Sequence, residues 1–189
     1  MCVNLQTSII AFIVGIVCGL ILATEDNEKR ALGIFIMFYS FVQLCEAYIY
    51  YFGKDETKLA SKLLLINLGL QGIVYFILIS YYVQVNTVFF LICGLVSLLV
   101  TFKATERNFK AANIETCMKW NFMDNITSYS LIIMYITIIT YSQLSSNKII
   151  NISGKYFILT YILASLMQGN GPSLWCLLSA ITAPFLLLL

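Results

Sequence analysis

Long apolar runs alternate with short polar segments along the whole chain. Each run approaches the roughly 20 residues that an α-helix needs to cross the hydrocarbon core of a bilayer. Charged clusters at residues 25–30 and 54–56 end the first two runs. The pattern therefore predicts seven membrane-spanning helices, at residues 8–23, 31–52, 63–83, 87–102, 122–142, 149–168 and 173–189.

The polar connections between these runs are too short to fold by themselves. In the longest one, 103–119, the recurrence of Phe109, Ala112 and Trp120 at helical spacing predicts a short helical extension at the membrane interface. The expected fold class is all-α, a seven-transmembrane-helix integral membrane bundle with short loops. It forms one domain over 1–189, and its expected partner is the lipid bilayer.

Composition supports lipid as the main solvent of the chain. Hydrophobic residues make up 60% and charged residues 11%, and the mean hydropathy is +0.89, whereas a soluble domain is about a quarter charged. The net charge of +2 is small, and the basic residues are spread over several loops without forming a basic face. We therefore expect no nucleic-acid partner.

The distribution of basic residues predicts an orientation, because loops on the cytoplasmic side carry the excess of Lys and Arg. Loops that follow the second and fourth helices hold Lys54, Lys58, Lys62, Lys103, Arg107, Lys110 and Lys119. The opposite side holds Lys29, Arg30, Lys148 and Lys155. We expect a cytoplasmic N-terminus and an outer or lumenal C-terminus.

Glu46 is the acid that lies well inside a predicted span. A charged residue at the middle of a membrane costs roughly 2.5–3.5 kcal/mol on insertion scales. Tyr39, Gln43, Glu46 and Tyr50 follow one another by four, three and four positions, so they share one helix face. The carboxyl group is then either protonated, as desolvation favours, or it faces partners inside the bundle.

Two other predicted helices carry polar side chains that could meet this face. Asn67, Gln71 and Tyr75 form a second stripe, and Trp175, Ser179 and Thr182 form a third. Counted back from the loops, Glu46, Asn67 and Ser179 should lie at a similar depth in the membrane. The polar site predicted for a proton or ligand consists of Gln43, Glu46, Asn67, Gln71, Trp175 and Ser179.

Short motifs in the chain resemble a family of uncharacterised seven-helix membrane proteins of large DNA viruses and bacteria. They are Q-x-x-E at Gln43 and Glu46, L-Q at Leu70 and Gln71, and L-W-C at residues 174–176. The chain departs from the family at Gly72, where members usually carry Pro. The resemblance implies the seven-helix topology, a viral or bacterial origin, and a site around these motifs.

Catalysis is not expected, because the chain lacks the groups that usually perform it. It has no His, no Gly-rich phosphate loop and no paired carboxylates. The six Cys form no C-x-x-C pair, so neither a metal site nor a disulfide framework is expected. We predict a protein that is not an enzyme and has no cofactor.

Two functions remain open, and a membrane-embedded enzyme ranks behind both of them. The first is a small transporter or channel for a proton or small solute, with Glu46 as the titrating group. The alternative is a non-enzymatic membrane scaffold or assembly protein, in which the polar layer only clasps helices together. A clasp is favoured for Asn67 and Gln71, and an interfacial position for Trp175. Gly15/Gly19 and Gly69/Gly72 would permit close approach of helices.

Overall fold

The structure is a computed structural model of the whole chain. It describes residues 4–52, 57–83, 88–106, 113–114, 118–119, 125–144, 147–166, 178 and 180–188.

Helices dominate the described residues. Six of them are α-helices: α1 Leu5–Ala23, α2 Asn27–Phe52, α3 Thr57–Val83, α4 Val88–Glu106, α5 Asn125–Leu144 and α6 Lys148–Leu166. A 3₁₀ helix, η1, covers Ala183–Leu188, and two short strands, β1 Asn113–Ile114 and β2 Met118–Lys119, lie between α4 and α5. The prediction of a helical bundle is confirmed.

Polar side chains cap the start of α1 and the start of α2. Because the charged cluster at residues 25–30 includes the cap of α2, this helix begins four residues earlier than predicted. Asn4 accepts a hydrogen bond from the backbone N–H of Thr7 at 2.9 Å and starts α1. The Asp26 carboxylate accepts from the N–H groups of Glu28 and Lys29 at 3.1 and 2.9 Å and starts α2. Such acceptors satisfy donors that a helix N-terminus leaves without a partner.

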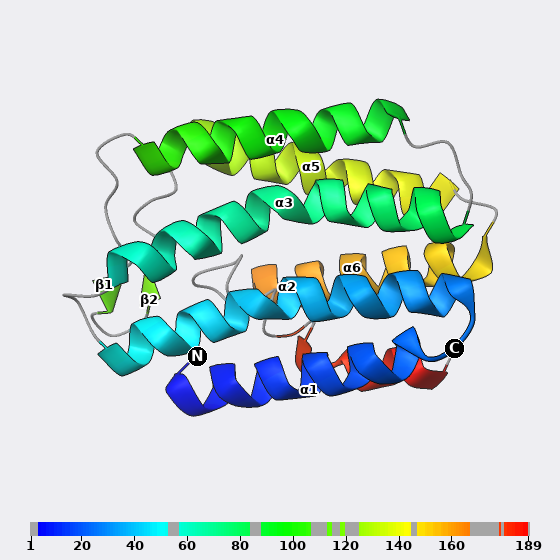
Figure 1. Cartoon of the computed structure of the whole chain (residues 1–189), viewed down its shortest axis with the longest axis horizontal. Coiled ribbons are helices and arrows are strands. Elements are labelled where there is room, and N and C mark those ends of the chain that lie inside the picture. The colour runs from blue at the N-terminus through cyan, green and yellow to red at the C-terminus, as the bar shows by residue number, and fades with distance from the viewer. Residues whose placement is uncertain are drawn as a thin grey trace.

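Two layers of roughly aligned helices make up the bundle (Figure 1). In one layer α1, α2, α3 and α4 lie side by side in chain order, and each packs against the next. Behind them, α5 contacts α3 and α4, α6 contacts α2, and η1 contacts α1. The middle of α2 is therefore covered from several sides, and 61% of its most apolar stretch is buried.

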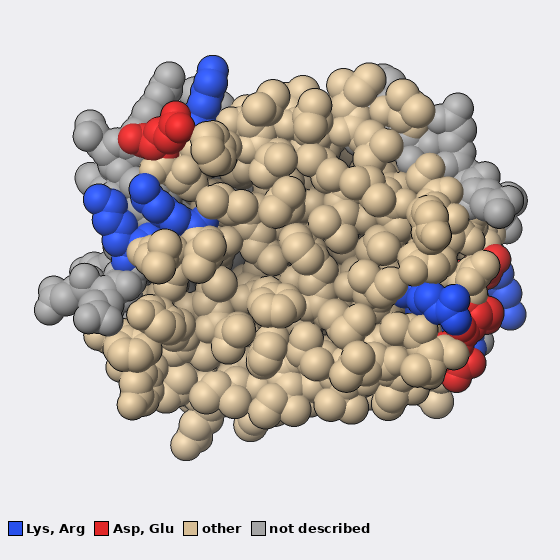
Figure 2. Space-filling model, in the orientation of Figure 1, with Lys and Arg blue, Asp and Glu red and all other residues tan. Residues whose placement is uncertain are grey.

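On the face of the bundle seen in Figure 2, charged side chains lie at the two ends of the long axis. Figure 2 shows Lys, Arg, Asp and Glu at the two ends of the visible face and none across its centre. Exposed side chains in the middle include Ile13, Val17 and Leu99. Among the described residues, three helices are long and apolar enough to cross a membrane: Leu5–Ala23, Asn27–Phe52 and Lys58–Val83.

The helical extension predicted over residues 103–119 is wrong in its second half. Helix α4 continues only to Glu106. Further along, Asn113 pairs with Lys119 and Ile114 with Met118 in an antiparallel ladder. A short helix without a buried face is marginal, whereas pairing two strands satisfies their backbone groups locally.

The last predicted helix, 173–189, is not a regular α-helix to its end. Residues 178, 180 and 181 are helical, but the chain turns at Thr182 and continues as η1. The N–H of Phe185 donates to the carbonyl oxygen of Thr182 at 3.0 Å, the spacing of a 3₁₀ turn. Pro184 explains the change, because it has no N–H and disfavours α geometry at the preceding residue.

Glycine allows α1 and α2 to approach unusually closely. A Cβ built on Gly19 would lie 2.7 Å from the carbonyl oxygen of Gly33, and one on Gly33 would lie 2.7 Å from the backbone nitrogen of Ala23. One turn earlier, the space for a side chain at Gly15 is filled by Ser40. The Gly15-x-x-x-Gly19 pair is therefore part of the α1–α2 interface.

Gly33→Ala should weaken this interface, since the added carbon meets backbone atoms that can move only with their helix. We expect a loss of about 1–3 kcal/mol in the free energy of unfolding, the usual range for overpacking. The measurement is an unfolding titration in mixed micelles. Val17→Ile, which adds a carbon to the exposed face of α1, should leave stability unchanged. Equal stability of both variants would contradict the close contact.

Candidate functional site

Gln43 and Glu46 lie one turn apart on α2, and neither exposes any surface. The predicted stripe also includes Tyr39, which is 3% exposed, so a row of polar side chains is enclosed by the bundle. Among the described residues, neither the Nε2 nor the Oε1 atom of Gln43 has a hydrogen-bond partner. An amide buried in this way costs roughly 1–3 kcal/mol unless something else bonds to it.

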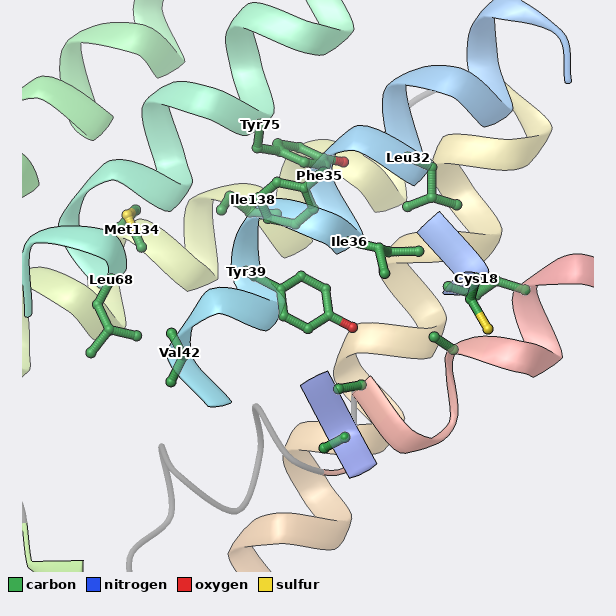
Figure 3. Packing of buried hydrophobic residues seen from close by; sticks show 14 of the residues in the cluster. Cys18, Leu32, Phe35, Ile36, Tyr39, Val42, Leu68, Tyr75, Met134 and Ile138 are labelled. Atoms are coloured by element: carbon green, nitrogen blue, oxygen red, sulfur yellow. The ribbon is translucent and has the colours of Figure 1, made fainter. Parts of the chain in front are cut away.

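The stripe on α2 faces the second layer of helices. The Tyr39 ring is directed toward α6 and the C-terminal segment, with its hydroxyl group leading (Figure 3). Tyr156 of α6 lies close enough to interact with the Tyr39 hydroxyl group and with Cys18 of α1. The row of Tyr39, Gln43 and Glu46 therefore lies where α2 meets α6 and the end of the chain.

A hydrogen bond joins α6 to the C-terminal segment beside Tyr39. The hydroxyl oxygens of Tyr156 and Thr182 are 2.7 Å apart. Thr182 gives its own proton to the carbonyl oxygen of Leu178 at 2.6 Å, so Tyr156 is the donor in the first bond. This hydrogen bond connects the turn at Thr182, where the C-terminal segment stops being α-helical, to the middle of α6.

The polar stripe of α3 takes part in a different network. The Tyr135 hydroxyl of α5 donates to Oε1 of Gln71 at 2.8 Å, and Nε2 of Gln71 donates to Oδ1 of Asn67 at 3.1 Å. Nδ2 of Asn67 then donates to the backbone carbonyl oxygen of Phe38 in α2 at 3.2 Å. Three helices are linked by this chain, as expected of a clasp.

The expected match in depth between Asn67 and Glu46 is wrong. Asn67 bonds to the carbonyl group of Phe38, which lies eight positions before Glu46, or roughly 12 Å along an α-helix. The two polar stripes are therefore offset along the bundle. They also leave α2 in different directions, because Phe38 and Glu46 differ by roughly 80° around the helix.

A second bond strengthens the contact between α3 and α5. The Tyr75 hydroxyl lies 2.6 Å from Oγ of Ser142, and Ser142 donates to its own helix at the carbonyl oxygen of Ile138. Tyr75 is therefore the donor to Ser142. The three residues of the α3 stripe, Asn67, Gln71 and Tyr75, all bond to other helices or to one another.

Two of the six predicted site residues, Trp175 and Ser179, lie outside the described residues. Gln43 and Glu46 come together on α2, while Asn67 and Gln71 belong to the clasp. Sequence reasoning missed Tyr135, Ser142 and Tyr156. The sequence does carry a signal, since Tyr135 and Ser142 are seven positions apart on one face of an apolar helix. Polar stripes were predicted only for residues 31–52, 63–83 and 173–189.

Near the opposite end of α2 from Glu46, a small cleft opens between α2, α3 and α6. It holds about 290 Å³ of empty space, including space open to solvent, and Glu28, Tyr75 and Ile150 are among its lining residues. The Glu28 carboxylate accepts a hydrogen bond from Asn147 at 2.6 Å. This contact fastens the start of α2 to the start of α6.

Within the part of the chain that the structure describes, no group of three His, Cys, Asp or Glu side chains is placed to hold a metal ion. The chain matches no family model, no curated protein and no solved structure.

Removing the hydroxyl group of Tyr135 should break the first link of the clasp. Tyr135→Phe is expected to lower the free energy of unfolding by about 0.5–1.5 kcal/mol, the range of hydrogen bonds between helices in membranes. The matched control is Tyr81→Phe, because Tyr81 is 75% exposed and should lose nothing. Both values come from unfolding in mixed micelles, and indistinguishable variants would show that the bond contributes nothing.

Proposed function

We propose that the chain is an integral membrane protein that acts as a small transporter or channel, with Glu46 as its proton-titrating group. The observation that carries the proposal is the burial of Gln43 and Glu46 side by side on α2. Among the described residues, the amide of Gln43 lacks a hydrogen-bond partner. Intramembrane acids mark ion and proton pathways by default, because their burial is costly.

The membrane location is supported by the apolar middle of the bundle. Charges at both ends and apolar helices between them suit a protein whose middle is surrounded by lipid (Figure 2). Figure 1 places the N-terminus and the C-terminus at opposite ends, which suits an odd number of spans. We propose seven spans, with the N-terminus in the cytoplasm.

Charged and titratable side chains lie on α2 itself and on the helices that pack around it. Cys45 adjoins it on α2, and Lys58 and Lys62 lie in the first turns of α3, at the same end of the bundle. Farther along, Tyr156 of α6 lies close to both Tyr39 and Cys18 of α1. These groups are the candidates for exchanging a proton with Glu46.

The second candidate function is a membrane scaffold or assembly protein without transport. The chain of hydrogen bonds from Tyr135 through Gln71 and Asn67 to Phe38 favours it. Those residues are occupied with each other, so they serve the bundle itself. In a scaffold, Gln43 and Glu46 would be a further clasp toward α6 and the C-terminal segment.

Proton flux into proteoliposomes distinguishes the two functions. The full chain is reconstituted with a trapped pH dye, and a potassium gradient with valinomycin sets the membrane potential. Glu46→Gln should lower proton flux by roughly a hundredfold, because a positioned acid or base contributes at least that much to proton transfer. Full flux in the variant, or no flux in the unmodified protein, would remove the transport proposal.

The matched control is Glu106→Gln, which neutralises an exposed acid near the end of α4 and should leave the flux unchanged. A scaffold gives a different pattern of stability. Glu46→Gln would then be mild, since Gln and protonated Glu both donate a hydrogen bond, whereas Glu46→Leu would lower stability by about 1–3 kcal/mol.

A further inference from the structure

From the geometry around Gln43, we infer that the site on α2 binds water and passes protons along a row of hydroxyl groups. It does not bind a bare metal cation. This inference rests on the proposed function and names what the site carries. The row runs from Glu46 past Gln43 to Tyr39 of α2 and on to Tyr156 of α6.

The chemistry of the amide selects the occupant. Gln43 presents both a donor, Nε2, and an acceptor, Oε1, and among the described residues neither has a partner. A metal cation would bond to the oxygen atom and leave the N–H groups buried without an acceptor. Water both donates and accepts, so it satisfies both ends of the side chain.

The spacing along α2 suits bridging water. Gln43 lies three positions from Glu46 and four from Tyr39, and side chains at these spacings lie roughly 5–6 Å apart on one helix face. Two hydrogen bonds, each about 2.7–3.0 Å long, span that distance with one water molecule between the two side chains. All three side chains are buried, so the polar row is shielded from lipid and bulk solvent.

The row continues from α2 to α6. The Tyr39 hydroxyl is directed toward α6 (Figure 3), where Tyr156 interacts with it. Tyr156 in turn donates to Thr182. From Glu46 to Tyr39 the row covers roughly 10 Å along the helix axis, and each hydroxyl group in it can accept one proton while it gives up another.

A single transfer is balanced without any co-reactant. The proton leaves the carboxyl oxygen of Glu46 and binds to the oxygen of the water molecule beside Gln43, which releases one of its own protons to the next water. The Tyr39 hydroxyl accepts that proton and releases its own toward Tyr156. One proton moves, no atom is oxidised or reduced, and Gln43 acts as a positioning residue that holds the water.

The test measures proton flux and metal-ion flux on the same proteoliposomes. Proton uptake is followed with the trapped pH dye, and uptake of radioactive sodium and rubidium is followed in parallel. The unmodified protein should carry protons and neither metal ion. Gln43→Leu and Tyr39→Phe should each lower proton flux about tenfold. Each variant removes roughly one hydrogen bond that holds the water in place during proton transfer, and a bond of about 1.4 kcal/mol corresponds to a tenfold change in rate.

Two further variants separate the loss of a relay from a loss of folding. Gln43→Asn keeps a donor and an acceptor and should retain most of the flux. Tyr135→Phe removes a hydroxyl group that also bonds to a glutamine but lies outside the row, so the flux should stay unchanged. If Gln43→Leu fails to insert, Gln43→Met, which has nearly the length of Gln, repeats the test.

Failure of the relay is distinguishable from failure of the transport function. If Glu46→Gln abolishes proton flux while Gln43→Leu and Tyr39→Phe keep it, Glu46 carries protons without the relay and the inference is overturned. Sodium or rubidium uptake that depends on Gln43 would assign the site to a metal cation and overturn it as well. If Glu46→Gln keeps full flux, the proposed function itself fails.

Discussion

The rest of the bundle depends on the burial of α2, because polar side chains on its buried face have no access to water. Glycines let α1 lie directly against its backbone, α3 covers a second side, and α6 contacts a third. A polar group on the buried face of α2 therefore cannot turn to water, and leaving it without a hydrogen bond is costly in an apolar interior. The arrangement of Asn67, Tyr135 and Tyr156 follows from this condition.

The two polar regions around α2 differ in whether their buried side chains have hydrogen-bond partners. On the side of α3 and α5, side chains bond to each other and to the backbone of α2, ending at the Phe38 carbonyl group. This network is complete and holds helices together. On the side of α6, Gln43 remains available among the described residues, beside a buried carboxylate. A network whose side chains all have hydrogen-bond partners acts as a clasp. A buried side chain without a partner, such as Gln43, marks a candidate site.

Much of the fold could be predicted, and the errors have identifiable physical causes. Apolar runs marked the helices well, but residues such as Asp26 were assigned to a loop although they form a helix cap. The last α-helix was predicted to run to residue 189 because the residues around Pro184 are apolar. Pro184 instead changes the end of the helix to a 3₁₀ helix. The strands at Asn113–Ile114 and Met118–Lys119 depend on backbone pairing across a short turn, and two-residue strands are too short to show a periodicity.

By itself, the sequence determined that Tyr39, Gln43 and Glu46 share one face, because the helical repeat depends only on spacing. It also determined that the polar stripe of α3 exists. Only the tertiary structure decided that the two stripes do not meet. How far one helix is shifted and rotated relative to its neighbour depends on how closely their surfaces pack. In this bundle the packing is set by glycines and by bulky side chains that lie against them, such as Met134. That packing places Asn67 in the clasp and leaves Gln43 without a hydrogen-bond partner among the described residues.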